Sequence, residues 1–367
     1  MISKPLRIVH TESSLGWGGQ EIRILAEAQG LMRRGHDVKL LCAPQAHIFA
    51  QAANWGVPAV PLPIDRKRPV GLGALHTWFT SNVSDIINTH SSTDSWLAAL
   101  VQTALGRPTR IVRTRHISAP VPRGPLSRWL YMRATAYVVT TGEAIKRELV
   151  ERNGYRANRI ESVPTGSDAG RYRPGERKAM RAKFGLPQDK TLVGIVATLR
   201  SWKGHASLLE AMTRLPAAIE LVVVGDGPQR EALEAQIARL DLRGRVRMQG
   251  QQADVLPWLR ALDIFALPSY ANEGVPQALV QAMLCELPCV TTAVGGIPEL
   301  AEHERTALVV PPQDPAAIAA AIERLAGDEG LRRELGENAR KHCVEGYSYE
   351  RMLDRMENIY RNVAGIF

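Results

Sequence analysis

Short apolar runs alternate with longer amphipathic segments along nearly the whole chain, and this alternation predicts strands followed by helices. The apolar runs lie between turn residues, whereas the segments between them place apolar residues three and four positions apart. Strands that are joined through helices pair in parallel, because each helix returns the chain to the same end of the sheet. The pattern therefore predicts an α/β protein with doubly wound parallel sheets and helices on both faces.

The predicted elements form two successive sets. The first set has strands at 6–11, 57–62, 85–90, 109–115, 137–141 and 159–163, one more strand after Gly35 and His36, and helices at 21–34, 47–55, 72–82, 95–105, 126–134 and 143–153. The second set has strands at 191–198, 219–224, 245–249, 263–267, 289–292 and 307–310, and helices at 175–184, 205–215, 275–285, 315–325, 331–345 and 349–363, with another ending at 240. The segment 162–174, rich in glycine and proline, separates the two sets. A chain of 367 residues exceeds one ordinary core, so two domains are expected, 1–167 and 168–347.

Composition limits the class of protein and its expected location in the cell. Hydrophobic residues make up 45% and charged residues 23%, as in soluble globular proteins. No apolar run reaches the length of a membrane-spanning helix, and the first residues do not form a signal peptide, so a cytoplasmic location is expected. The four cysteines, Cys42, Cys285, Cys289 and Cys343, lack a CxxC spacing. They are predicted to be reduced, mostly buried thiols, with neither a disulfide framework nor a metal site.

Positive charge is concentrated in the first half. Residues 1–166 contain 21 lysines and arginines against 11 aspartates and glutamates, whereas residues 167–367 contain 25 against 26. A basic domain suits an anionic acceptor or an anionic membrane surface, and an ordinary alkaline surface is the alternative. Trp78 and Phe79 follow the basic run 66–68 and fit either a membrane contact or the core, with the core favoured. Nucleic acid is not expected, because no recognition motif accompanies the arginines.

A loop between a buried strand and a short helix carries Glu273. The helix at 275–285 is predicted to have Pro276 in its first turn, where the missing N–H is no loss. The backbone N–H groups of Gln277, Ala278 and Leu279 would then face an anion or sugar hydroxyls at the helix N-terminus. The carboxyl edge of a parallel sheet is where α/β proteins bind phosphorylated ligands.

Two cations follow the first strand of the second half. Arg200 and Lys203 are three residues apart in the sequence LRSWKGH, so both can face the oxygens of one diphosphate. A solvated turn is the alternative for this pair taken alone. Asp226 has no second aspartate two residues away, so no metal-binding Asp-x-Asp pair is predicted, and the cationic side chains are expected to meet the charge of a bound phosphate.

The first half offers a glycine loop and two histidines. Gly18 and Gly19 stand between the first strand and its helix, where backbone can approach a phosphate closely, although a tight turn is the plainer explanation. His90 and His116 each follow a strand, at the sheet edge where ligand groups project. His116 is the preferred site candidate, and His90 is assigned an acceptor-side or a packing role.

These stretches resemble family 4 glycosyltransferases, which have the two-lobed GT-B fold. The resemblance rests on Glu273-Gly274, on LRSWKGH, and on the opening with Gly18-Gly19 followed by Gly35-His36. The sequence departs from the family at two positions. Gln281 stands where the family has a second glutamate. Thr198 stands where the family has an arginine, and Arg200 is expected to take the place of that arginine. A Gln281 amide can still hydrogen-bond a ribose diol, but without charge.

The resemblance implies a role for each half and for each site residue. Residues 168–347 would bind a nucleotide sugar, with Glu273 and His116 at the sugar, Arg200, Lys203, Gly18 and Gly19 at the diphosphate, and Gln281 at the ribose. Residues 1–167 would bind the acceptor, with the last helix, 348–367, crossing back onto that domain. No cofactor is implied besides the substrate nucleotide.

The sequence thus predicts a retaining, metal-independent glycosyltransferase of the hexosyltransferase type. It would transfer sugar from a UDP- or GDP-sugar to a lipid-linked or anionic cell-envelope glycan, as in polysaccharide or lipopolysaccharide synthesis. It would be cytoplasmic, and peripheral on the inner membrane face if the basic domain binds lipid. Two alternatives keep the fold: a sugar-nucleotide epimerase or phosphorylase, and an inactive nucleotide-sugar-binding relative. A phosphorylase is disfavoured, because no lysine motif for pyridoxal phosphate is present.

Overall fold

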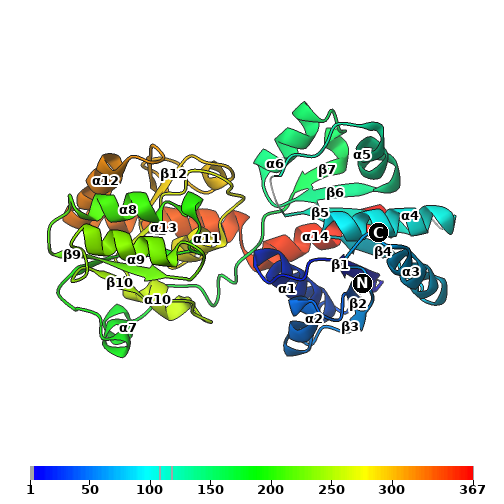
Figure 1. The fold of residues 1–367 in the computed structure, drawn as a ribbon, viewed down its shortest axis with the longest axis horizontal. Coiled ribbons are helices and arrows are strands. Elements are labelled where there is room, and N and C mark those ends of the chain that lie inside the picture. The colour runs from blue at the N-terminus through cyan, green and yellow to red at the C-terminus, as the bar shows by residue number, and fades with distance from the viewer. Residues whose placement is uncertain (1–3, 107–108, 117–118, 367) are drawn as a thin grey trace. The chain divides into compact units, whose positions relative to one another are not determined.

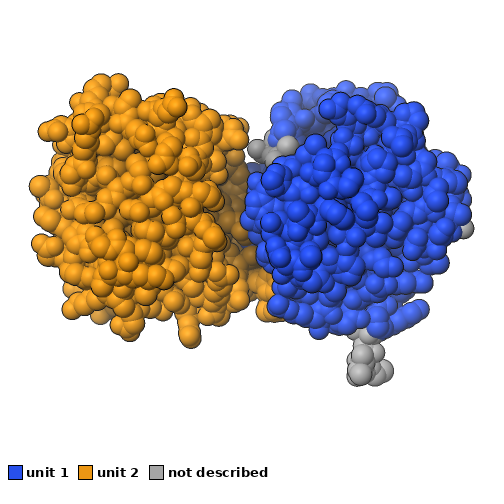
Figure 2. Space-filling model, turned by 60° about the horizontal axis from the view of Figure 1, so that its bottom comes forward, with its two compact units in different colours: residues 1–165, 352–367 blue, residues 166–351 orange. Residues whose placement is uncertain are grey.

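Parallel strand pairing builds two separate sheets, as the alternation of strands and helices predicted. The computed structural model describes residues 4–106, 109–116 and 119–366. The chain divides into two units, residues 1–165 with 352–367 (unit 1) and residues 166–351 (unit 2), which Figures 1 and 2 show. Each unit has its own sheet, and the strand pairs of both sheets are parallel.

The sheet of unit 1 has seven strands in the order β3-β2-β1-β4-β5-β6-β7. They are β1 (Arg7–Glu12), β2 (Asp37–Cys42), β3 (Ala59–Pro61), β4 (Ile86–Thr89), β5 (Arg110–Arg115), β6 (Tyr137–Thr140) and β7 (Ile160–Ser162). Its helices are α1 (Gly19–Arg33), α2 (His47–Ala52), α3 (Pro69–Ser81), α4 (Ser92–Ala104), α5 (Pro125–Trp129), α6 (Glu143–Arg147) and, mostly in this unit, α14 (Tyr349–Ala364). Short 3-10 turns lie at Ala53–Trp55 and Ala157–Arg159, and π-helical turns at Leu130–Ala134 and Glu148–Arg152.

The sheet of unit 2 has six strands in the order β10-β9-β8-β11-β12-β13. They are β8 (Thr191–Val196), β9 (Ile219–Val224), β10 (Val246–Met248), β11 (Ile264–Leu267), β12 (Cys289–Thr292) and β13 (Leu308–Val310). Its helices are α7 (Arg177–Phe184), α8 (His205–Met212), α9 (Arg230–Arg239), α10 (Leu256–Ala261), α11 (Gln277–Leu284), α12 (Pro315–Gly327) and α13 (Glu329–Gly346), with 3-10 turns at Ser201–Lys203 and Ile297–Glu299. Every residue of β9 is buried, because helices cover both faces of a parallel sheet.

The last helix, α14, docks on unit 1 through a buried polar network. The Tyr360 hydroxyl donates to Glu27 of α1 at 2.6 Å and accepts from the Asn88 side chain of β4 at 2.6 Å. Asn88 in turn accepts from the Thr114 hydroxyl of β5 at 2.9 Å. Arg23 of α1, fully buried, pairs with Glu27 at 3.6 Å. One tyrosine therefore ties the C-terminal helix to α1 and to the centre of the sheet.

The structure changes several predicted boundaries. Helix α11 begins at Gln277, and Pro276 is its N-cap with extended backbone angles, so the prediction that Pro276 lies inside the first turn is wrong. The predicted helices 126–134 and 143–153 each consist of a short α-helix that continues as a π-helical turn. Phe79 is buried in the core of unit 1 and Trp78 packs edge-on against it, so the core interpretation of this pair is confirmed.

All four cysteines are free and buried, as predicted. Burial raises the pKa of the Cys42, Cys285 and Cys343 thiols to about 12. A thiol with so high a pKa remains protonated and unreactive at neutral pH, so these cysteines act as small apolar side chains.

Candidate functional site

The strand order of each sheet defines one topological switch point at its carboxyl edge. In unit 2, β8 and β11 are neighbours, but the chain leaves β8 toward β9 and leaves β11 toward β12, in opposite directions. The loops after β8 and β11 therefore diverge, and open α/β sheets bind ligands at such a switch point. The 3-10 turn that ends at Lys203 follows β8, and the loop with Glu273 follows β11. The predicted site residues of unit 2 thus come from the two strands that flank this point.

Lys203 and Glu273 form a tight ion pair. The Lys203 ammonium donates to both carboxylate oxygens of Glu273, at 2.7 and 2.9 Å. The Ser269 hydroxyl donates to the same carboxylate at 2.6 Å. The Glu273 side chain is 4% exposed and that of Lys203 is 20% exposed. A charge this deeply buried needs a partner, and removing one partner of such a pair typically costs about 3–5 kcal/mol.

Neighbouring turns hold the loop of Glu273 from both sides. Gly204 and Gly295 have positive φ angles of 79° and 60°, and a β-carbon on either would overlap a carbonyl oxygen of the loop, that of Pro268 or that of Glu273. The backbone N–H of Gly296 donates to the Glu273 carbonyl at 3.2 Å. Glycine is required at these positions because the backbones meet without room for a side chain. The carboxylate is therefore preorganised by the fold.

Arg200 lies apart from this ion pair. Its side chain is exposed, and its guanidinium lies over the Trp202 ring at 5.6 Å from the centroid. Thr198, the aligned family position, is also exposed. The structure brings Lys203 together with Glu273 and leaves Arg200 on the solvent side of the same turn.

Helix α11 presents its N-terminus directly after the Glu273 loop. Helix geometry leaves the N–H groups of Gln277 and Ala278 without an acceptor inside the helix. The Leu279 N–H instead donates to the Pro276 carbonyl at 3.1 Å, so it is engaged within the first turn. Gln281 lies half-buried one turn further along α11. Of the three predicted amide donors, the N–H groups of Gln277 and Ala278 are thus not used by the hydrogen bonds of the helix itself.

In unit 1 the glycine loop leads straight into α1. Gly18 is the N-cap with an extended backbone, and Gly19 is the first helical residue. A β-carbon on Gly19 would meet nothing within 4 Å, and one on Gly18 would meet only the Glu21 side chain at 3.7 Å. The fold itself therefore does not require glycine here, and the space in front of these two residues is open.

His116 and His90 are joined in one chain with a third histidine, His10. His10 Nδ1 lies 2.9 Å from His90 Nε2, and His90 Nδ1 lies 2.9 Å from His116 Nε2. Burial, with the charge of Arg23 as a smaller cause, lowers the pKa of all three and takes those of His90 and His116 well below the usual value. All three rings are therefore neutral at physiological pH.

Two carboxyl groups beside this chain were not predicted as site residues. Burial, reinforced by the charge of Asp94, raises the pKa of Glu12 to about 8, and burial raises that of Asp94 to about 6. Glu12 accepts from Ser91 Oγ at 2.5 Å and from Gln20 Nε2 at 2.5 Å, which ties the glycine loop to the start of α4. The only sequence signal for Glu12 is an acid directly after an apolar strand.

In unit 2, Ser269, Thr292 and His205 were missed. Thr292 supports Ser269 by donating to its carbonyl at 2.5 Å, and Ser269 holds Glu273. Burial, helped by the Lys203 charge, lowers the pKa of His205 to about 4, so this first residue of α8 is neutral. A single serine or threonine at a strand end carries no pattern that distinguishes it from ordinary loop residues.

Acidic and histidine side chains do not converge into a metal-ion site in the described part of the chain, where no group of three suitable ligands is found. Asp226, at the carboxyl end of β9, pairs with Arg230 of α9 at 3.0 Å.

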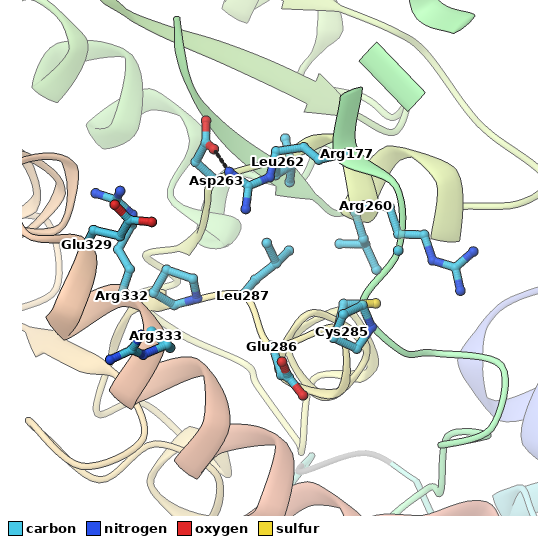
Figure 3. A pocket seen from close by; sticks show the side chains of 14 residues that line it. Arg177, Arg260, Leu262, Asp263, Cys285, Glu286, Leu287, Glu329, Arg332 and Arg333 are labelled. Atoms are coloured by element: carbon cyan, nitrogen blue, oxygen red, sulfur yellow. Dashed lines mark hydrogen bonds and ion pairs between the residues drawn. The ribbon is translucent and has the colours of Figure 1, made fainter. Parts of the chain in front are cut away.

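A hollow of about 280 Å³ lies at the opposite, amino edge of the unit 2 sheet. Figure 3 shows its lining, which includes Asp263 just before β11 and several arginines. Asp263 is already bound by Arg177 at 2.5 Å, by Arg181 at 2.5 Å and by the Leu192 N–H at 2.8 Å. Because its acid is used within the fold and ligands of α/β sheets bind at the carboxyl edge, this hollow is not taken as the candidate site.

Models of two glycosyltransferase families match the chain, one on each half. The model described as Glycosyltransferase Family 4 matches residues 17–171, and that described as Glycosyl transferases group 1 matches residues 176–342. The D-inositol 3-phosphate glycosyltransferase of Saccharomonospora viridis is 27% identical over 395 residues, covering 95% of this chain and 90% of the relative. The N-acetyl-alpha-D-glucosaminyl L-malate synthase of Bacillus anthracis is 28% identical over 206 residues, covering 56% of this chain and 54% of the relative.

Solved structures share the fold at lower sequence identity. A glycosyltransferase from Rickettsia africae matches with a TM-score of 0.88 and 18% identity over 98% of both chains. Anabaena HepE in complex with UDP matches with a TM-score of 0.87 and 20% identity, over 97% of this chain and 100% of that one. Two Rossmann-like parallel-sheet units define this protein as a GT-B fold, as predicted. With both halves matched by glycosyltransferase families, the protein is a glycosyltransferase.

The turn at Gly295 gives a test of how the Glu273 loop is held. Gly295→Ala adds both the strain of a positive φ and an overlap with the Glu273 carbonyl, whereas Gly185→Ala adds the same strain in open space. We expect Gly185→Ala to cost about 1 kcal/mol and Gly295→Ala at least about 2 kcal/mol more, measured by urea unfolding. Equal costs for the two variants would show that the loop is not held at Gly295.

Proposed function

We propose that the protein is a retaining, metal-independent glycosyltransferase that uses a nucleotide sugar. The observation that carries this proposal is the buried Lys203–Glu273 pair at the switch point of unit 2. Transfer breaks the bond from the anomeric carbon to the diphosphate and forms one to an acceptor hydroxyl. Negative charge then grows on the departing phosphate while positive charge grows at the anomeric carbon, and a fixed cation beside a fixed carboxylate matches that distribution.

The donor is proposed to be a UDP-sugar, with a GDP-sugar as the alternative base. Support comes from Anabaena HepE, whose solved structures are described as complexes with UDP and with UDP-glucose. Lys203, whose side chain is part-exposed, would meet the diphosphate, with Arg200 on the solvent side of the same turn and the free amides of α11 nearby. Gln281 would hydrogen-bond the ribose hydroxyls.

Retention is proposed to follow from front-side attack. The acceptor hydroxyl would give its proton to the departing phosphate oxygen, so that no side chain has to act as the base. Glu273 would then orient the donor sugar and stabilise the anomeric carbon, with its charge held in place by Ser269 and Lys203. Gly18 and Gly19 would admit the diphosphate to the N-terminus of α1, because the space in front of them is open.

The acceptor is proposed to be an anionic polyol or glycan bound by unit 1. The surplus of positive charge before residue 167 supports this proposal. Several relatives are described as D-inositol 3-phosphate glycosyltransferases, whose named substrate carries a phosphate. A lipid-linked cell-envelope glycan shares this anionic chemistry and remains the proposed alternative.

The same basic unit is proposed to bind anionic membrane from the cytoplasmic side. Helix α5 and its π-helical continuation carry exposed Arg128 and Arg133 beside Trp129, and Leu126 is 69% exposed. Exposed apolar side chains among arginines suit a surface that lies on acidic headgroups. Of the helices within the described residues, none is both long and apolar enough to cross a bilayer.

Vesicle flotation tests the membrane proposal. The protein should float with anionic vesicles at low salt and not with neutral ones, because the attraction is screened over about 10 Å at 0.1 M salt. Arg128→Glu with Arg133→Glu should abolish flotation, while Arg243→Glu, an exposed arginine of unit 2, should not. Equal flotation with neutral and anionic vesicles would contradict the proposal.

Nucleotide release from a panel of UDP-, GDP- and ADP-sugars, with and without acceptor, tests the proposed function. Lys203→Ala and Glu273→Gln should each lower kcat/KM by about 100-fold, because each removes one fixed charge from the reaction centre. Lys178→Ala changes an exposed lysine of α7 and should have no effect.

A double variant separates chemistry from folding. Lys203→Met leaves a buried carboxylate unpaired and should destabilise the protein, whereas Lys203→Met with Glu273→Gln should recover much of that stability without recovering turnover. Full activity of Lys203→Ala would refute the assigned diphosphate contact. Tight UDP binding in a thermal shift assay, without turnover of any donor, would instead identify an inactive relative, and interconversion of the donor an epimerase.

The glycine loop gives an independent test. Gly19→Ala places a methyl group in open space at the first turn of α1, so it should stabilise the protein by about 0.5 kcal/mol while lowering turnover. Gly73→Ala, in α3 with equally open surroundings, should stabilise without loss of activity. Unchanged activity in Gly19→Ala would show that no ligand approaches this turn.

A further inference from the structure

We propose that His10, His90 and His116 form a one-way hydrogen-bond chain that holds His116 as the neutral Nδ1–H tautomer, so that its ring offers a donor to an oxygen of the bound substrate. His10 and His90 are then positioning residues, which act through His116. The substrate contact rests on the proposed function, but the chain and its direction rest on unit 1 alone.

The chain is built by three adjacent strands. His10 is the fourth residue of β1, and His90 and His116 directly follow β4 and β5, which are the next two strands in the sheet. Successive ring centroids lie 5.2 Å apart, with interplanar angles of 18° and 33°. Parallel neighbours end at one edge, so the rings stand side by side and each nitrogen contact is 2.9 Å.

Asp94 fixes the middle of the chain. Its carboxyl oxygens accept from the His90 N–H and the Ser91 N–H, both at 2.9 Å, and from the Thr11 hydroxyl of β1 at 2.7 Å. The backbone of His90 is thereby tied to β1 and to the first turn of α4. Its ring cannot turn away without breaking contacts on both sides.

Both hydrogen bonds of the chain must point the same way. A neutral imidazole has one N–H and one lone pair, so if His90 accepts from one neighbour it donates to the other. Only two arrangements exist: all three rings carry the proton on Nδ1, or all three carry it on Nε2. In the first, His116 presents an N–H at its outer nitrogen, and in the second it presents a lone pair.

The surroundings of His10, at the buried end of the histidine chain, select the first arrangement. His10 Nε2 is buried and, among the described residues, has no hydrogen-bond partner. Buried N–H groups without an acceptor are rarer in proteins than buried acceptors without a donor. Glu27 and Arg23 act on the pKa of His10 in opposite senses, Glu27 more strongly, so the lack of an acceptor for Nε2 in the described part of the chain, and not the nearby charge, decides the direction. His10 Nε2 is therefore the lone pair, and every N–H points toward His116.

This direction gives His116 a defined chemistry. A ring that accepts at Nε2 from His90 has Nδ1–H as its free group, and that group can donate to a sugar hydroxyl or to a phosphate oxygen. It cannot remove a proton from the acceptor. The chain therefore suits a reaction in which the departing phosphate, and no side chain, receives the acceptor proton.

Long-range 1H–15N NMR of the full-length protein labelled with 15N-histidine measures the tautomers directly at pH 7.5. We expect Nδ1 to be protonated in His10, His90 and His116, although free histidine favours the Nε2–H form. Signals are assigned by their loss in His10→Phe and His116→Asn. Nε2–H at His116 would overturn the proposal, and the tautomers are read in the wild type without substrate.

Breaking the chain tests the positioning role. His90→Phe should return His116 to the Nε2–H form and lower kcat about tenfold, with the thermal shift by UDP unchanged. His76→Asn, an exposed histidine of α3, should change neither. An unchanged His116 tautomer in His90→Phe would refute the chain. If the wild type releases no nucleotide from any donor, the proposed function fails, while the tautomers still decide this inference.

Discussion

The buried carboxylate of Glu273 is the group on which the arrangement of the unit 2 loops depends. Its charge is almost completely removed from water, so the fold has to supply compensation, and it does so with one cation and one hydroxyl. The turns at Gly204 and Gly295 exist in their observed form because this loop passes against their backbones. The carboxyl edge of the unit 2 sheet therefore carries one fixed pair of opposite charges, Lys203 and Glu273.

Most of the fold could be predicted from the sequence, because it follows from local patterns. Buried parallel strands such as β9 (IELVVV) and β12 (CVTT) are rich in β-branched residues, and their boundaries were predicted to the residue. The misplaced boundaries lie where local rules compete. Proline is favoured at the first helical residue, but the backbone of Pro276 is extended and the helix starts one residue later. The change from α- to π-helical turns after α5 and α6 has no sequence signature.

The candidate site could be predicted only as single residues. Lys203 and Glu273 are 70 positions apart, and their pairing arises from the adjacency of β8 and β11, which the alternation of elements does not determine. The same holds for the histidine chain, which needs β1, β4 and β5 to be neighbours. His10 was missed because its partner His90 lies 80 positions away. Ser269 lies only four residues before Glu273, but a single serine at a strand end carries no distinguishing pattern.

Both units use the same topological feature for different chemistry. In unit 1 the neighbours at the switch point are β1 and β4, and the groups collected there are neutral rings beside the acid Glu12, whose pKa is raised to about 8. In unit 2 the switch point collects full charges. Glycosyl transfer needs both kinds of environment: fixed charges where a diphosphate departs, and directional uncharged hydrogen bonds where hydroxyl groups are oriented. Under the proposed function, one architecture used twice with different residues at its carboxyl edge would provide both environments.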